Sequence, residues 1–329
     1  YCRCGHRLPA NDRSAPAVAL GHLNVMAPLP DSASDALTTW IYDIGWKIAR
    51  TLPEPAANAT FRQIADALWF RRAGGVNQLE RNLQRVHPDA SEADIRDMSR
   101  AGMRSYMRYW CEAFRLPTWS MERITDTFIL GRQEILDTAL ESGGALMIPG
   151  HMANWDHAGA WAAATYGSVT SVAERVKPEK LFDAFLAYRT KLGMDIYPTG
   201  HPNVLDELAG KLRQGKLVAL VGDRDISRRG VHVDFFGEPA SFPVGPATLA
   251  IETGVPLHPV TMWFDGDICR GYVHDRVEVP TEGDHDERVR AITQQLAHGW
   301  EAGITEHSAD WHMLQKVWVS DLTPRMEAS

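Results

Sequence analysis

The stretch GGALMIPGHMANWD, residues 143–156, is where the sequence changes from helix-like patterns to short apolar runs. Its central run, residues 145–149, has the length and composition of a buried strand, which Pro149-Gly150 ends. Further runs of this kind alternate with helix-like segments, and this alternation predicts an α/β fold with a central, mostly parallel sheet flanked by helices. The other predicted strands are residues 169–173, 217–222, 231–236, 257–264 and 270–279, and the predicted helices are residues 154–166, 178–193, 202–214, 245–253 and 285–306.

The residues before this stretch are predicted to be mainly helical, up to about residue 125. Apolar residues recur at three- and four-residue steps over residues 37–52, with charged residues on the other side, which is typical of an amphipathic helix. Residues 1–34 show no period, and we expect a disordered or non-native leader there. No linker divides residues 35–320, which we expect to form a single domain, and residues 321–329 are expected to be a tail.

Composition and charge exclude several classes of function. The net charge of −8 is unfavourable for nonspecific binding to nucleic acid, which depends on a surplus of Lys and Arg. No apolar run approaches the roughly 20 residues that span a bilayer, and we see no signal peptide. The four cysteines show no disulfide framework, which favours an enzyme in a reducing compartment. A metal knuckle at Cys2, Cys4 and His6 is a minor alternative.

His151 follows the strand of residues 145–149 at its carboxyl end, where open α/β sheets place groups that handle ligands. Within one helix, a spacing of five would put His151 and Asp156 about 140° apart, so we expect His151 in the loop and Asp156 in the first turn of the next helix. There the carboxylate could accept a hydrogen bond from one ring nitrogen, while the other nitrogen takes a proton from a hydroxyl. No Ser or Cys lies in the stretch, so direct attack by that hydroxyl is simpler than a covalent enzyme intermediate.

Two other interpretations of this pair remain open. A loop histidine followed by an acid at a helix N-terminus is a common arrangement, which the helix dipole favours without any catalysis. His151, Asp156 and His157 are also close in sequence, as metal ligands can be. Against a metal site, His157 would face away from the loop in a regular helix, and no further His/Cys cluster completes a ligand set.

Further blocks of sequence accompany His151 and Asp156. They are ERVK at residues 174–177, VGDRD at 221–225, VDFFG at 233–237, FPVGP at 242–246 and DWHMLQKVW at 310–318. Over roughly residues 35–320 these blocks resemble the bacterial acyltransferases typified by the lauroyl and myristoyl transferases of lipid A synthesis, and more closely the phosphatidylinositol mannoside acyltransferases. Gln315-Lys316, where a His-Arg pair is usual in the lipid A branch, favours the mannoside branch.

The resemblance implies a set of site residues. His151, Asp156 and Asp223 would be catalytic, with Asp223 accepting a hydrogen bond either from the histidine or from a sugar hydroxyl of the acceptor. The structural alternative for the Asp223 block is an Asp-Arg ion pair that braces a turn. The implied substrate-binding residues are Glu174, Arg175, Arg189, Arg224, Asp225, Phe242 and Gly245.

Two of these groups suit an anion. Arg175 or Arg189 could bind a phosphate of the lipid or of coenzyme A through two parallel hydrogen bonds. Phe242 and Gly245 introduce a helix whose first backbone N–H groups could hold an oxyanion or a phosphate.

The resemblance also implies the reaction, which is transfer of a long acyl chain, typically palmitoyl, from coenzyme A to the 6-hydroxyl of the mannose on position 2 of inositol. Acyl-CoA would be the co-substrate, with no cofactor and no metal. The other partners would be mannosylated phosphatidylinositol and the cytoplasmic face of the cell inner membrane or plasma membrane, bound peripherally. Residues 37–52 are a candidate for that membrane contact and equally for packing on the core, and Arg71-Arg72 and Arg228-Arg229 are candidate basic contacts.

Three other functions remain alternatives. In a hydrolase of acyl esters or thioesters, His151 would activate water instead of a sugar hydroxyl. A lipid A-type acyltransferase would use a different acceptor. A lipid-binding module would keep the fold and lack turnover.

Overall fold

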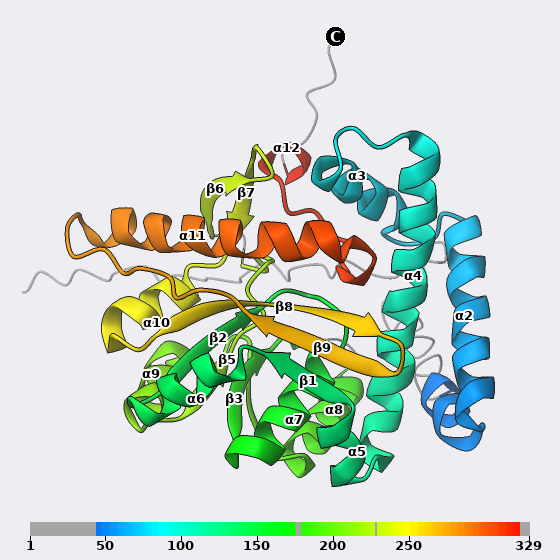
Figure 1. Ribbon diagram of the computed structural model, residues 1–329, viewed down its shortest axis with the longest axis horizontal. Helices are drawn as coiled ribbons and strands as arrows, with labels where there is room; N and C mark the ends of the chain where they lie inside the picture. The colour runs from blue at the N-terminus through cyan, green and yellow to red at the C-terminus, as the bar shows by residue number, and fades with distance from the viewer. Residues whose placement is uncertain (1–43, 176–178, 228, 323–329) are drawn as a thin grey trace, which may run out of the picture.

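A seven-stranded sheet forms the centre of the computed structural model, which describes residues 44–175, 179–227 and 229–322 (Figure 1). The strand order is β1-β9-β8-β2-β5-β3-β4, and neighbouring strands are parallel except for the antiparallel pair β8 and β9. A separate antiparallel hairpin consists of β6 and β7. The strands are β1 (Phe128–Gly131), β2 (Ala145–Pro149), β3 (Val169–Ala173), β4 (Met194–Pro198), β5 (Leu217–Ala219), β6 (Val231–Phe235), β7 (Glu238–Phe242), β8 (Leu257–Asp265) and β9 (Ile268–Val273).

Helices precede, connect and follow these strands. Residues 44–51 are helical, and two short 3-10 helices, η1 (Leu116–Thr118) and η2 (Ser308–Asp310), adjoin α4 and α11. The α-helices are α2 (Glu54–Phe70), α3 (Val76–Val86), α4 (Glu92–Arg115), α5 (Met121–Asp126), α6 (Gln133–Glu141), α7 (Trp155–Tyr166), α8 (Glu179–Lys191), α9 (Val204–Arg213), α10 (Gly245–Thr253), α11 (His285–Glu306) and α12 (Val319–Leu322).

The predicted fold class is confirmed, since a mostly parallel sheet is flanked by helices and preceded by a helical portion. The strands expected at residues 145–149 and 169–173 and the helices expected at 245–253 and 285–306 have the observed bounds. The prediction that residues 231–236 belong to the buried sheet is wrong, because β6 pairs with β7 in the separate hairpin and packs against α11. The strands β1, β4 and β7 were not predicted.

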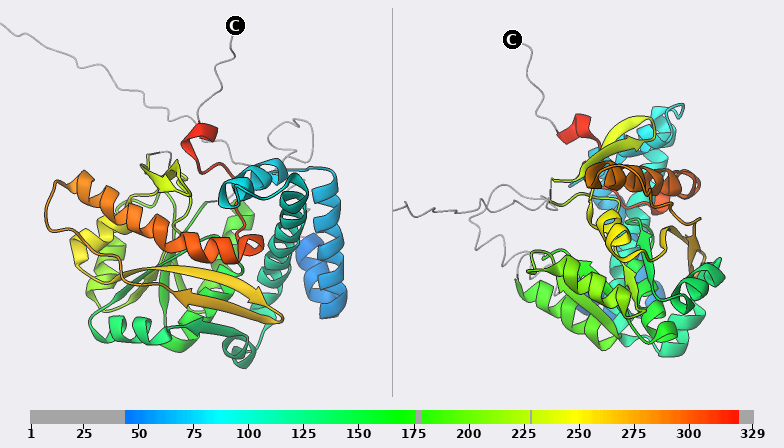
Figure 2. Two further views of the ribbon diagram at one scale, coloured as in Figure 1. Left: turned by 45° about the horizontal axis from the view of Figure 1, so that its top comes forward. Right: turned by 90° about the vertical axis from the view of Figure 1, so that its left-hand side faces the viewer.

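Alternate residues of β8 face opposite layers of helices. Thr261 faces α11, where Gly303 allows a close approach: a Cβ atom at this glycine would lie 2.5 Å from Thr261 Oγ1. Val260 and Met262 face the other way and line a cavity together with residues of α7. Helices α10 and α11 therefore cover one face of the sheet, and α6 and α7 cover the other (Figures 1 and 2).

The N-terminal helices α2, α3 and α4 pack on one another beside the sheet and enclose a second small apolar cluster (Figure 1). Trp46, on the helical residues 44–51, stacks on Phe114 and Phe185 with ring centroids 5.5 and 5.7 Å apart. The described part of the amphipathic segment 37–52 therefore packs on the core through this side chain. The rest of that segment, the leader and the Cys2-Cys4-His6 group lie outside the described residues. None of the described helices has the length and apolar character needed to cross a membrane.

Candidate functional site

His151 lies in the loop between β2 and α7, as the spacing argument predicts. The side chain of Asn154 caps α7 by accepting a hydrogen bond from His157 N at 2.9 Å, so Asp156 falls in the first turn of the helix. Ala153 has a φ of 45°, an uncommon value for a residue with a side chain, and its N–H donates to the Asp310 carbonyl at 2.9 Å. The loop thus has a fixed, partly strained shape that presents His151 at the carboxyl end of β2.

The His151 ring is held by Asp223 and not by Asp156. Nδ1 of His151 donates to Asp223 Oδ1, and the backbone N–H of His151 donates to Asp223 Oδ2 at 2.8 Å. Because an ionised carboxylate can only accept, Nδ1 carries a proton, and in the neutral ring Nε2 therefore keeps its lone pair. Of the two partners considered for Asp223, the histidine is the one found. The expected hydrogen bond between Asp156 and His151 is replaced by this one.

The Asp223 side chain is fully buried and forms a hydrogen-bonded pair with His151. Burial raises the pKa of its carboxyl group, but the charge of His151 in its protonated form and the hydrogen bonds of His151, together with a hydrogen bond from the Trp311 indole, outweigh burial and hold that pKa below its usual value. The carboxylate is therefore ionised near neutral pH and can stabilise a positive charge on His151.

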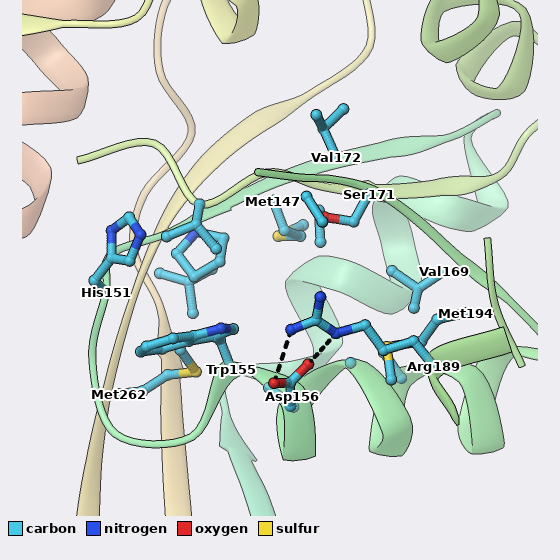
Figure 3. A pocket seen from close by; sticks show the side chains of 18 of the residues that line it. Met147, His151, Trp155, Asp156, Val169, Ser171, Val172, Arg189, Met194 and Met262 are labelled. Carbon is cyan, nitrogen blue, oxygen red and sulfur yellow. Dashed lines mark hydrogen bonds and ion pairs between the residues drawn. The ribbon is translucent and has the colours of Figure 1, made fainter. Parts of the chain in front are cut away.

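Asp156 belongs to a second buried network, in which it forms a bidentate ion pair with Arg189 of α8 (Figure 3). The Asp156 oxygens accept from Arg189 Nε at 2.6 Å and Nη2 at 3.0 Å, and Tyr109 OH donates to the same carboxylate at 3.0 Å. Burial would lower the pKa of Arg189, but the neighbouring Asp156 charge raises it well above its usual value. Arg189 therefore stays charged, and this network ties α4, α7 and α8 together.

A cavity of about 340 Å³ lies between the sheet and α7 and has His151 in its wall. It runs from His151 past Trp155 and the Asp156–Arg189 pair towards Val169 and Met194 (Figure 3). Small residues of α7 make room for it, since the helix turns Ala158, Gly159 and Ala162 towards the sheet at three- and four-residue steps. Its shape and mostly apolar lining suit a hydrocarbon chain with its reactive end at the histidine.

Two of the other predicted residues join this cavity. Glu174 at the end of β3 and Arg224 in the loop after β5 form an ion pair, and both side chains line the cavity. They add a charged pair to the polar groups around His151.

Four predicted residues are not brought to the cavity. Arg175 is exposed and pairs with Glu179, and Asp225 accepts hydrogen bonds from Ser227 and Gly230 N, the latter at 2.7 Å. Asp225 thus braces its own turn, but through these hydrogen bonds and not through the Asp-Arg ion pair of the structural alternative, because Arg224 pairs with Glu174. Phe242 is buried at the end of β7, and Gly245 starts α10, and neither lines the cavity.

The metal interpretation of His151, Asp156 and His157 is not supported by their positions. The His157 ring lies between Trp119 and Phe128, and its Nε2 donates to the Ile124 carbonyl at 2.9 Å. Within residues 44–175, 179–227 and 229–322, the one group of potential ligands that converges is the largely exposed set Asp234, His298 and Glu301, which is remote in sequence from His151.

A second histidine, His312, also lines the cavity. Its Nε2 lies 2.8 Å from Ser105 Oγ, and this hydroxyl donates to Asp310 at 2.5 Å. Burial, and to a smaller degree the nearby His151, lower the pKa of His312 to about 3, so this ring is neutral beside the candidate base.

The C-terminal segment 310–312 completes the site, and the sequence reasoning gave it no role. The Trp311 indole donates to Asp223 Oδ2 at 2.9 Å, and the backbone of this segment pairs with the loop around His151. The sequence prediction also omitted Trp155, whose ring stacks on Tyr109 with the centroids 4.0 Å apart and packs edge-to-face with the His151 ring with the centroids 5.4 Å apart. The sequence signal for both tryptophans is their position, since Trp155 directly precedes Asp156 and Trp311 directly precedes His312.

Comparison with known proteins shows the family to which the chain belongs. The sequence model described as "Bacterial lipid A biosynthesis acyltransferase" matches residues 31–320. A phosphatidylinositol mannoside acyltransferase of Mycobacterium tuberculosis is 41% identical over 304 residues, which cover 90% of this chain and 93% of that protein. The protein of the same name from Mycolicibacterium smegmatis is 42% identical over 292 residues, which cover 87% of this chain and 93% of the relative. The chain belongs to the bacterial lipid A biosynthesis acyltransferase family.

Proposed function

We propose that this protein transfers a long-chain fatty acyl group, palmitoyl, from acyl-CoA to the 6-hydroxyl of a mannose on phosphatidylinositol mannoside. The observation that carries the proposal is a histidine held by a buried carboxylate in the wall of a mostly apolar cavity. The names of the relatives, which cover nearly the whole chain, support the acceptor.

In the proposed mechanism, neutral His151 is the general base. As the sugar oxygen attacks the thioester carbon, Nε2 takes the hydroxyl proton, and the imidazolium that forms is stabilised by ionised Asp223. The tetrahedral intermediate then collapses: the carbon–sulfur bond breaks, the ester carbonyl forms, and the imidazolium passes its proton to the leaving thiolate. The products are the acylated sugar and free coenzyme A, and His151 returns to its neutral state.

The acyl chain would occupy the cavity from His151 towards Val169 and Met194. The cavity falls in the size range of small-molecule sites, and burying methylene groups there contributes about 0.8 kcal/mol each. This arrangement would keep the thioester carbon at the histidine, because the apolar chain gains most when it is fully inserted.

We propose that the Glu174–Arg224 ion pair of the cavity wall binds the acceptor. Each of these two charges already has its partner, so the pair suits hydroxyl groups of a sugar better than a phosphate. The Asp156–Arg189 pair lies along the part of the cavity that the acyl chain would occupy. Asp156 would then act on the architecture of α7, and Asp223 would act on the base.

We further propose peripheral binding at the cytoplasmic face of the membrane, since the proposed acceptor is a bilayer lipid. Phe70 at the end of α2 is 79% exposed, and the charged Arg71 and Arg72 follow it directly. An exposed aromatic side chain beside basic residues suits an anionic membrane surface.

The test is mass spectrometry of products after incubation with palmitoyl-CoA and a panel of phosphatidylinositol, phosphatidylinositol mannosides and a lipid A precursor. The proposal expects acylated mannoside with the natural protein and none with His151→Ala, which should still bind palmitoyl-CoA. Free palmitate released at the same rate without acceptor would indicate a hydrolase, acylation of the lipid A precursor alone would indicate the other branch, and binding without turnover would indicate a lipid-binding module.

A further inference from the structure

We propose that Trp311 is a positioning residue of the acyl transfer, which acts through Asp223 to set the basicity and orientation of His151. This inference rests on the proposed role of His151 as the base. Its starting point is a hydrogen bond from the indole Nε1 to Asp223 Oδ2 at 2.9 Å, between two side chains that are both fully buried.

The hydrogen bonds to Asp223 are divided between its two oxygens in a way that fixes its orientation. Oδ2 accepts from Trp311 Nε1 and from the backbone N–H of His151, at 2.9 and 2.8 Å. Oδ1 is left to accept from His151 Nδ1. Because two donors converge on Oδ2, rotation of the carboxylate away from the ring would break both of these bonds, and the indole therefore helps to hold the ring in its productive direction.

The chemistry of the indole suits this task better than a cation would. Among the described residues, no Lys or Arg lies at ion-pair distance from Asp223, and His151 is its one ionisable partner. The indole N–H is a neutral donor that stabilises the buried anion without cancelling its charge. The full charge remains available to stabilise the imidazolium when His151 takes a proton.

The backbone ties this indole to the loop that carries the base. Met152 and Trp311 form an isolated antiparallel bridge, and His312 N donates to the His151 carbonyl at 2.8 Å. The position of the donor is therefore fixed relative to the base by the main chain on both sides of Trp311.

The test is the variant Trp311→Phe, which keeps an aromatic ring and removes the donor. Without the hydrogen bond from the indole, the Asp223 carboxylate stabilises the imidazolium form of His151 more strongly. As the pH falls, His151 therefore becomes protonated at a higher pH in this variant. We expect the acid limb of the pH–rate profile to move up by roughly half a pH unit and kcat to fall on the order of 10-fold, while KM for palmitoyl-CoA stays unchanged.

Trp318→Phe is the matched control. Trp318 is also fully buried and lies 6.1 Å from the Trp311 ring, but its indole donates to the Phe235 carbonyl at 3.0 Å. This variant should lose a similar amount of stability and keep the acid limb in place. Acid limbs that superimpose for Trp311→Phe and the natural protein would overturn the inference.

A measurement on the natural protein covers the case in which Trp311→Phe does not fold. The Trp311 indole ¹H–¹⁵N resonance should move with the same midpoint as the His151 ring titration, and a resonance indifferent to that titration would also overturn the inference. Failure of the proposed function has a different signature: His151→Ala would keep its turnover. With His151→Ala inactive and the Trp311→Phe profile unchanged, only the role of Trp311 falls.

Discussion

Replacing Asp223 by Asn should switch the tautomer of His151 and remove its proposed function as a base. Two N–H groups, from the His151 backbone and the Trp311 indole, point at the Oδ2 position, so the amide oxygen must take that place. The amide NH₂ group then faces His151 Nδ1. Because two donors cannot bond, the ring moves its proton to Nε2, the atom that would accept the hydroxyl proton in the proposed mechanism.

The size of the effect follows from the same geometry. The flipped amide would leave two buried donors without an acceptor, at about 1–3 kcal/mol each, so it is sparsely populated. In the Ser-His-Asp triad the corresponding Asp→Asn change lowers kcat about 10⁴-fold, which corresponds to about 5.5 kcal/mol of transition-state stabilisation. We expect a loss of that order, with palmitoyl-CoA binding retained.

The assay is the rate of formation of acylated mannoside, measured with Asp223→Asn and Asp225→Asn under saturating palmitoyl-CoA. Asp225 lies two residues away and braces its own turn through hydrogen bonds from Ser227 and Gly230, so its variant should keep a rate close to that of the natural protein. An Asp223→Asn rate within about tenfold of the natural protein's would refute the tautomer argument.

Three further outcomes follow from buried groups. Asp156→Asn leaves the Arg189 guanidinium buried without its carboxylate and should lower the free energy of unfolding in urea by about 3–5 kcal/mol, whereas a loss below about 1 kcal/mol would contradict the buried ion pair. Ala162→Phe projects into the cavity and should shift a competition between palmitoyl-CoA and decanoyl-CoA towards the shorter chain, and an unchanged product ratio would place the acyl chain elsewhere. Burial, and to a smaller degree the nearby His151, hold the pKa of His312 at about 3, below the ordinary histidine value of 6.5. Between these two pH values the ring therefore binds a proton when the protein unfolds. The contribution of this ring to the free energy of unfolding should therefore be fully present above pH 6.5 and be lost as the pH falls towards 3. His312→Gln should reduce the slope of the free energy of unfolding against pH in this range by up to about 1.4 kcal/mol per pH unit. An unchanged slope would mean that the folded ring also titrates near 6.5.

The fold could be predicted where local pattern and long-range packing agree. Residues 145–149 are a continuous apolar run between glycines, and such a run is buried on both faces in any parallel sheet. Residues 231–236 have an equally good strand pattern, but pattern does not specify the pairing partner, which here is β7. Strands β1 and β4 form the two edges of the sheet and are mostly half-buried or exposed, so burial constrains their sequence less than that of the central strand β2.

In the site, too, local spacing predicts where a residue lies but not which residue it pairs with. The loop position of His151 and the helical position of Asp156 follow from a spacing of five residues. The partner of His151 lies 72 residues away, and the partner of Asp156 lies 33 residues away, so both depend on how strands and helices are arranged. Asp223 entered the prediction through its resemblance to a family block, with two open roles. Local spacing alone favoured the wrong carboxylate for the histidine.

The pairing of the C-terminal segment with the His151 loop has a consequence for the order in which the protein is made. Trp311 follows Asp223 by 88 residues, so at synthesis rates of about 5–20 residues per second the carboxylate exists for roughly 4–18 s before its indole donor is even joined to the chain. The sheet and its cavity can begin to form in that time, before Trp311 can donate its hydrogen bond to Asp223. A ribosome-bound or prematurely released chain can thus contain most of the sheet and still lack the hydrogen bond from Trp311 that orients Asp223.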